Sequence, residues 1–123
     1  DRRAGHAGRQ EGRTDEAAKR LLDAAASLDQ AGADLLLLEC VPNQVTEAIM
    51  EATSVPVIGI GAGPSTTGQV LVMHDLLGIT PGKPARFVKN FMQDASSIQQ
   101  AFEDFDRAVK QGVFPSPEHC FEQ

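Results

Sequence analysis

Apolar and polar residues follow one another along this chain in a pattern that predicts helices and strands in turn. Between residues 14 and 31, apolar side chains recur every three or four positions, which is the spacing of one helix face. Thr14 is suited to cap this helix and Gly32 to end it. The next run, DLLLLE at 34–39, is short, apolar and unbroken. Such a run is typical of a strand that is buried on both faces of a parallel sheet.

The middle of the chain continues this alternation. Pro42 is a suitable first residue for a shorter amphipathic helix that carries apolar side chains as far as residue 52. Residues 54–63 are β-branched and then glycine-rich, which indicates a second strand. A Ser/Thr-rich turn or helix start is expected at 65–68, and the run QVLVMHD at 69–75 predicts a third strand.

The rest of the chain is expected to hold a long loop, a long helix and an irregular tail. Gly and Pro residues mark the loop over 78–84, and a helix over 95–111 ends near Gly112. The order helix, strand, helix, strand, short helix, strand, helix predicts an α/β fold with parallel strands. Three strands leave open edges, and a closed eight-stranded barrel needs roughly 250 residues. We therefore expect these 123 residues to be a piece of a larger domain.

The composition favours small-molecule chemistry over binding to nucleic acid or membranes. The net charge is −6, whereas a nucleic-acid surface needs a basic stripe, and no apolar stretch approaches the roughly 18 residues of a membrane span. The N-terminal residues lack the apolar core of a secretion signal. Two distant cysteines, Cys40 and Cys120, are too few for a disulfide framework, so we expect reduced thiols and a cytoplasmic location.

Glu39 is the candidate catalytic residue. In parallel α/β folds, chemistry takes place at the carboxyl ends of the strands, and Glu39 places a carboxylate there directly after four leucines. A carboxylate in that position is suited to act as a general base. From the residues alone, a buried structural carboxylate paired with Arg or Lys remains the alternative.

Three further motifs have structural as well as functional explanations. The glycines of GIGAG at 59–63 favour close packing over dinucleotide binding, because their spacing is not that of the dinucleotide fingerprint. His74 and Asp75 end the third predicted strand, where neighbouring side chains alternate faces, so at most one of them is expected to line a site. Residues 118–120 (EHC) have the chemistry of metal ligands, but adjacent residues rarely converge on one ion, so no metal site is predicted there.

Several of these segments, taken together, resemble the C-terminal half of the 3-methyl-2-oxobutanoate hydroxymethyltransferase family, also called the ketopantoate hydroxymethyltransferases. The resemblance covers residues 8–123 in the order that the family has them. The segments are QEGRT at 10–14, LECVP at 38–42, VPVIGIGAG at 55–63, GQVLVMHD at 68–75, KNF at 89–91 and EHCF at 118–121.

This resemblance implies a (β/α)8 TIM barrel of the phosphoenolpyruvate/pyruvate type. Residues 1–123 would form a partial barrel with about strands six to eight, and the N-terminal half of the barrel would be absent. The implied reaction transfers a hydroxymethyl group from methylenetetrahydrofolate to 3-methyl-2-oxobutanoate, which gives 2-dehydropantoate for pantothenate and coenzyme A synthesis. Glu39 matches the proton acceptor of the family. A Mg²⁺ ion is implied with ligands in the missing half, so no metal ligand or folate-binding residue is assigned in this chain.

The implied partners are small molecules and further copies of the same protein. The helix over 95–111 is expected to make subunit contacts, because its face with Phe102 and Phe105 exceeds what three strands can cover. Two other interpretations stay open. One is a catalytically incomplete fragment that acts as an assembly or binding module. The other is a different barrel of the phosphoenolpyruvate/pyruvate type, such as a lyase or mutase.

Overall fold

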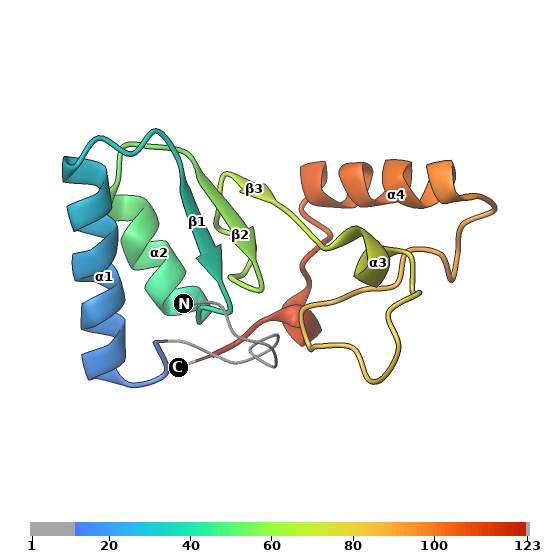
Figure 1. Cartoon of the computed structure of the whole chain (residues 1–123), viewed down its shortest axis with the longest axis horizontal. Coiled ribbons are helices and arrows are strands. Elements are labelled where there is room, and N and C mark those ends of the chain that lie inside the picture. Colours follow the sequence, from blue (N-terminus) through green and yellow to red (C-terminus); the bar gives the residue numbers. More distant parts are fainter. Residues whose placement is uncertain (1–11, 123) are drawn as a thin grey trace.

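The computed structural model describes residues 12–122, which form an α/β fold around a parallel sheet. Its strands lie in the order β1, β2, β3, and both strand pairs are parallel, so the predicted α/β class with parallel strands is confirmed. Within the described residues, no helix is long and apolar enough to cross a membrane. The elements are α1 (Asp15–Gln30), β1 (Leu36–Glu39), α2 (Asn43–Ala52), β2 (Val57–Ile60), β3 (Gly68–Gln69), α3 (Met73–Leu76), α4 (Ile98–Lys110) and the 3₁₀ helix η1 (Pro117–His119) (Figure 1).

The first helix forms where its sequence signals predict. The Thr14 side chain accepts a hydrogen bond of 3.1 Å from the backbone N–H of Ala17, a cap that stabilises a helix by about 1 kcal/mol. At the other end, Gly32 adopts a φ of 96°, and the N–H of Ala33 donates to the carbonyl of Leu28. This left-handed turn satisfies carbonyls that the end of the helix leaves open. The predicted helix over 14–31 is confirmed as α1.

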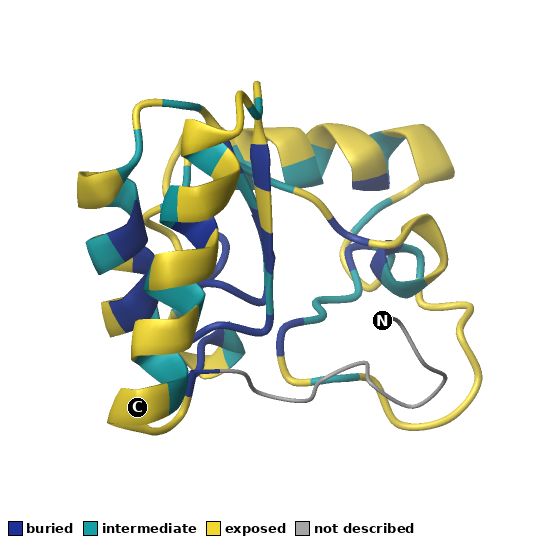
Figure 2. Cartoon of the chain, turned by 60° about the vertical axis from the view of Figure 1, so that its left-hand side comes forward, coloured by how far each residue is buried: buried dark blue, intermediate teal, exposed yellow. Residues whose placement is uncertain are grey.

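One face of the sheet is covered along its length, whereas the other is covered only near the carboxyl ends of the strands. α1 and α2 both lie on the same side of the strands (Figure 1), and α1 is buried toward the sheet and exposed outward (Figure 2). Leu36 and Leu38 point into this covered side, whereas the Leu37 side chain is 53% exposed. The prediction of a strand buried on both faces was therefore wrong, because helices cover only one face. The first core contains Ala25, Leu36, Leu38, Val41, Val45, Ile49, Val57 and Ala62.

The second strand is shorter than predicted and ends at its glycines. β2 stops at Ile60, and the next residue, Gly61, turns the chain with a φ of 67°. No helix follows β2, since residues 64–67 form turns that lead into β3. The Gln69 side-chain amide donates to the carbonyl of Gly63 at 2.8 Å, which closes this loop on itself.

The strand predicted at 69–75 was wrong over most of its length. Only Gly68–Gln69 is a strand, and Met73–Leu76 forms the helix α3, so the short helix follows the third strand instead of preceding it. The N–H of Val70 still donates to the carbonyl of Gly59, but β2 turns away at Gly61. After Val70 the chain can no longer pair with β2, so the hydrogen bonds of the helix α3 replace those of the sheet.

The C-terminal half packs around a second hydrophobic core on the other side of the sheet from α1 and α2 (Figure 1). The ring of Phe91 packs there edge-on against the rings of Phe105 and Phe114, at a centroid distance of 5.5 Å from each. Such aromatic pairs contribute roughly 0.5–1.5 kcal/mol beyond the burial of their area. The second core contains Cys40, Leu71, Leu76, Phe87, Phe91, Ala101, Phe114 and Phe121.

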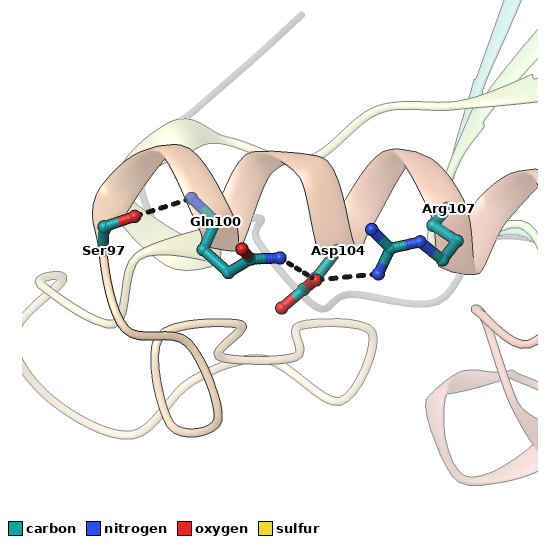
Figure 3. A network of polar contacts seen from close by, with 4 residues as sticks. All are labelled: Ser97, Gln100, Asp104 and Arg107. Carbon is teal, nitrogen blue, oxygen red and sulfur yellow. Dashed lines mark hydrogen bonds and ion pairs between the residues drawn. The ribbon is translucent and has the colours of Figure 1, made fainter.

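The helix α4 begins at a capped residue and carries a polar network on its outer side. Ser97 caps it by accepting a hydrogen bond of 3.0 Å from the backbone N–H of Gln100. The side chains of Gln100 and Arg107 both donate to Asp104, at 2.8 and 3.1 Å (Figure 3). These contacts hold the three side chains in place, and the helix then ends before Gly112 at a φ of 73°. The predicted helix over 95–111 is confirmed apart from its first turn, which is irregular.

Candidate functional site

Glu39 is the last residue of β1 and lies at the carboxyl end of the sheet. Its register partner is Ile60, the last residue of β2. Because side chains alternate along a strand, Glu39 projects to the same face as Leu37, away from the first core. Its side chain is half-buried. The carboxylate therefore lies at the carboxyl end of β1, where the sequence placed it, and on the face that α1 and α2 leave uncovered.

The residue after Glu39 has an unusual backbone conformation. Cys40 adopts a φ of 55°, a left-handed geometry that costs most residues other than glycine about 1–2 kcal/mol. Its side chain is 1% exposed and packs in the second core, whereas strand alternation would have placed it in the first core beside Leu36 and Leu38. Glu39 is thus held at the point where the two cores meet. A sequence gives little warning of this turn, since Cys is not a residue that favours it.

Hydrogen bonds continue past the strand end and fix the turn. The N–H of Cys40 donates to the carbonyl of Ile60 at 2.9 Å, and the N–H of Val41 donates to that of Gly61 at 3.0 Å. The hydrogen-bond ladder between β1 and β2 therefore continues for two residues after Glu39. The backbone that carries the carboxylate is fastened on both sides of it.

The glycines after β2 allow close packing at this edge, as predicted. A Cβ atom on Gly61 would meet the ring of Phe87 at 2.9 Å, and one on Gly63 would collide with the side-chain amide of Asn43. Both glycines also have positive φ, at 67° and 80°. Only glycine meets both requirements. The packing explanation of the segment 59–63 is therefore confirmed.

The C-terminal tail and the loop before α4 also reach the carboxyl end of the sheet. The N–H of Asn43, at the start of α2, donates to the carbonyl of Phe121 at 3.1 Å. The Arg86 guanidinium lies 5.6 Å from the centroid of the Phe121 ring, and its neighbour Phe87 packs on Gly61. The sequence pattern had marked the tail only as irregular, so its position beside the strand ends was not predicted.

His74 and Asp75 do not end a strand. Both lie on α3, where His74 is exposed and Asp75 is half-buried. The Thr80 hydroxyl donates to the Asp75 carboxylate at 2.6 Å, which ties the following loop to this short helix. The alternation argument made for a strand therefore does not apply to this pair.

The segment 118–120 serves local structure. The backbone N–H of Ser116 donates to Nδ1 of His119 at 3.2 Å, and Sγ of Cys120 donates to the Ser116 carbonyl at 3.3 Å. Burial lowers the pKa of His119 below its ordinary value; the nearby Glu118 opposes this shift and Lys89 adds to it. Within residues 12–122, no group of three or more His, Cys, Asp or Glu side chains is placed to hold a metal ion.

Comparison with known proteins gives a consistent result. Residues 3–117 match the family model described as ketopantoate hydroxymethyltransferase. A protein of Alcanivorax borkumensis named 3-methyl-2-oxobutanoate hydroxymethyltransferase is 56% identical over 113 residues, which cover 92% of this chain and 43% of that protein. Proteins of Hahella chejuensis and Chromohalobacter salexigens with the same name, the former numbered 2, are 54% and 53% identical over 111 residues, or 90% of this chain and 42% of each relative. The chain thus spans less than half the length of these curated relatives.

Proposed function

This chain belongs to the ketopantoate hydroxymethyltransferase family, and on that premise we propose that the complete protein transfers a hydroxymethyl group to 3-methyl-2-oxobutanoate. The donor in this proposal is methylenetetrahydrofolate, the product is 2-dehydropantoate, and the reaction takes place in the cytoplasm. The observation that carries the proposal is the position of Glu39 at the carboxyl end of β1, on the face that the helices leave uncovered. In parallel α/β enzymes, that end of the strands carries the chemistry.

Glu39 acts as the general base in this proposal. Its carboxylate removes the proton from C3 of 3-methyl-2-oxobutanoate, and the electron pair of the broken C–H bond forms the enolate. The methylene carbon is joined to two folate nitrogens. Water breaks the first of these C–N bonds, which leaves a hydroxymethyl group on one nitrogen and a proton on the other. C3 of the enolate then forms a bond to the hydroxymethyl carbon as the second C–N bond breaks, and tetrahydrofolate leaves with the proton taken from C3 on its second nitrogen. This role requires a carboxylate held in a fixed place, which the hydrogen bonds of Cys40 and Val41 to the end of β2 provide.

Magnesium belongs to the proposal, with ligands expected in the part of the complete protein that precedes this chain. A bound Mg²⁺ ion would polarise the keto group and make the C3 proton more acidic. This chain contributes the base and the apolar side chains beside it. Leu37 and Ile58 are register partners and lie on the same face of the sheet as Glu39.

The open face of the sheet supports a partial barrel. Leu37 of β1 and Val70, which directly follows β3, are 53% and 42% exposed. Exposed apolar side chains that gather on one face require a cover. In the proposed TIM barrel, this face is the interior, and further parallel strands close against β1 and β3. The same face also suits the second candidate, a catalytically incomplete module that assembles with another protein through it.

A deuterium exchange experiment tests the role of Glu39. In the full-length gene product, the substrate 3-methyl-2-oxobutanoate is expected to exchange its C3 proton for deuterium when magnesium is present. Glu39→Gln removes the base but keeps the shape of the side chain, so we expect the exchange rate to fall at least a hundredfold, in line with the contribution of general base catalysis. Glu47→Gln is the control, because Glu47 is an exposed carboxylate on α2.

Each result has a distinct meaning. Unchanged exchange in the Glu39→Gln protein would show that another group is the base. A full-length protein without the substitution that neither exchanges the proton nor forms 2-dehydropantoate would favour the assembly module.

A further inference from the structure

A cavity that does not include Glu39 is lined by three cationic side chains. Its volume is about 850 Å³, and Arg13, Lys83 and Arg86 line it. Two carboxylates, those of Glu118 and Glu122, are also part of its wall. The chain as a whole carries a net charge of −6, so a gathering of three cations runs against the overall charge. We call this site the cationic cavity.

The cationic cavity lies at the same edge of the sheet as Glu39. Phe121, which lines it, accepts a hydrogen bond from Asn43, the first residue after the turn that follows β1. Arg86 is followed by Phe87, whose ring packs on Gly61 at the end of β2. The cavity is therefore joined to the carboxyl ends of both strands, although Glu39 itself is not part of its wall.

The cations of this cavity are available to bind an anion. Within the described range, neither Arg13 nor Lys83 forms an ion pair with another residue. The Arg86 guanidinium stacks over the Phe121 ring at 5.6 Å, which restrains the side chain and leaves its N–H groups to other partners. Glu118 accepts a hydrogen bond of 3.2 Å from the Ser116 hydroxyl. The wall thus offers donors for carboxylates and also acceptors for N–H groups.

We propose that the cationic cavity binds the glutamyl tail of the folate donor. A γ-glutamyl tail carries several carboxylates separated by amide N–H groups, which matches a wall of three cations and two carboxylates. This inference rests on the proposed function, because it takes a folate as the one-carbon donor.

The two substrates differ in how far their carboxylates lie from the reacting carbon, and this difference shows which of them suits the cationic cavity. In 3-methyl-2-oxobutanoate the carboxylate is two bonds from the reacting C3, so it must bind close to Glu39. In the folate, an aminobenzoyl group separates the methylene carbon from the glutamyl carboxylates. A cation site at the same edge of the sheet, but without Glu39 in its wall, therefore fits the folate tail.

Kinetics with two forms of the donor test this assignment. In the full-length gene product, methylenetetrahydrofolate with three glutamyl groups is expected to have a KM several-fold lower than the form with one. Lys83→Gln should raise the KM for the triglutamyl form about fivefold, since the loss of a charge-assisted contact of roughly 1 kcal/mol corresponds to that factor. Arg86→Gln should have a similar effect, and Arg86→Lys, which keeps the charge, should recover part of it.

The controls separate this inference from the proposed function. Lys110→Gln removes a cation from the exposed side of α4, where it pairs with Asp106, and should leave the KM for both donors unchanged. If the unsubstituted protein exchanges the C3 proton but has the same KM for both donors, the proposed function stands and the glutamyl site is wrong. An unchanged KM for the triglutamyl form in Lys83→Gln and Arg86→Gln would overturn it as well. Absence of exchange and transfer in the unsubstituted protein would instead refute the proposed function.

Discussion

The backbone N–H of Cys40 donates a hydrogen bond of 2.9 Å to the carbonyl of Ile60, although Cys40 has already left strand geometry at a φ of 55°. The ladder between β1 and β2 thus continues through a residue that turns the chain. Strained backbone conformations of this kind persist where the surrounding structure determines them, and they cluster at functional sites. Here the strained residue directly follows Glu39. We infer that the turn at Cys40 sets the direction of the Glu39 carboxylate.

Substitutions at Cys40 test this positioning role. Cys40→Gly accepts a positive φ without strain, so we expect the turn to persist and the C3 exchange rate to stay within a few-fold of the original. Cys40→Val is β-branched and strongly disfavours this φ, so the chain is expected to lose the turn and the exchange rate to fall about tenfold or more. Exchange rate and KM for 3-methyl-2-oxobutanoate are measured together with the melting temperature of each variant.

The melting temperatures separate the effect of stability from that of the turn. Both variants lose the Cys40 thiol from the second core, but they differ in side-chain volume, so their exchange rates are compared at a temperature where both proteins are fully folded. A Cys40→Val protein that is folded and exchanges at the original rate would exclude the positioning role.

The parts of the fold that depend on local signals were predictable. Thr14, Gly32 and the apolar face between them define α1, because capping and helix periodicity act within a few residues. Glu39 was identifiable for the same reason, as a carboxylate that directly follows a short apolar strand. Residues 69–75 were misassigned because strand formation depends on a distant partner, and β2 turns away at Gly61 before the strand can lengthen.

The cationic cavity was beyond the reach of the sequence pattern. Arg13 lies before α1, whereas Lys83 and Arg86 lie in the loop that follows α3. Only the folded chain brings these segments together, through the contact of Arg86 with Phe121 and the hydrogen bond from Asn43 to the tail. No spacing rule along the chain connects residues so far apart.

The two phenylalanines of α4 are expected to differ when each is changed to aspartate. Phe105 packs against Phe91 and Phe114 at 5.5 and 5.9 Å, so Phe105→Asp should lower the free energy of unfolding by about 3 kcal/mol or more. The Phe102 side chain is 38% exposed, so Phe102→Asp should change the stability of one subunit by less than about 1 kcal/mol. Urea denaturation of the two variants measures this difference. The sequence had grouped the two residues as one interface, and the contacts of Phe105 assign it to the core instead.

Phe102 therefore remains the residue that tests the predicted subunit contact. If α4 lies between copies of the protein, Phe102→Asp should weaken the oligomer, and analytical ultracentrifugation over a range of protein concentrations should show dissociation at higher concentrations than before. Ile98, also exposed on α4, offers a second position for the same test. An oligomer that survives both Phe102→Asp and Ile98→Asp would place the subunit contact elsewhere.

His119 is expected to make stability depend on pH in a defined direction. Its pKa is lowered in the folded chain, chiefly by burial, so the folded state favours the neutral ring and the unfolded state binds the proton more readily. The contribution of the neutral His119 ring to stability is therefore complete above the unfolded pKa of about 6.5 and is lost as the pH falls through the lower folded pKa. Protonation at Nδ1 would also replace the acceptor for the Ser116 N–H by a second donor.

Urea denaturation at pH 7.5 and at pH 5 tests this contribution of His119. The urea midpoint should fall less between the two pH values in His119→Asn, which does not titrate, than in the original protein. His74→Asn, at an exposed histidine on α3, should keep the full drop, and an equal drop in all three proteins would show that His119 does not carry the effect.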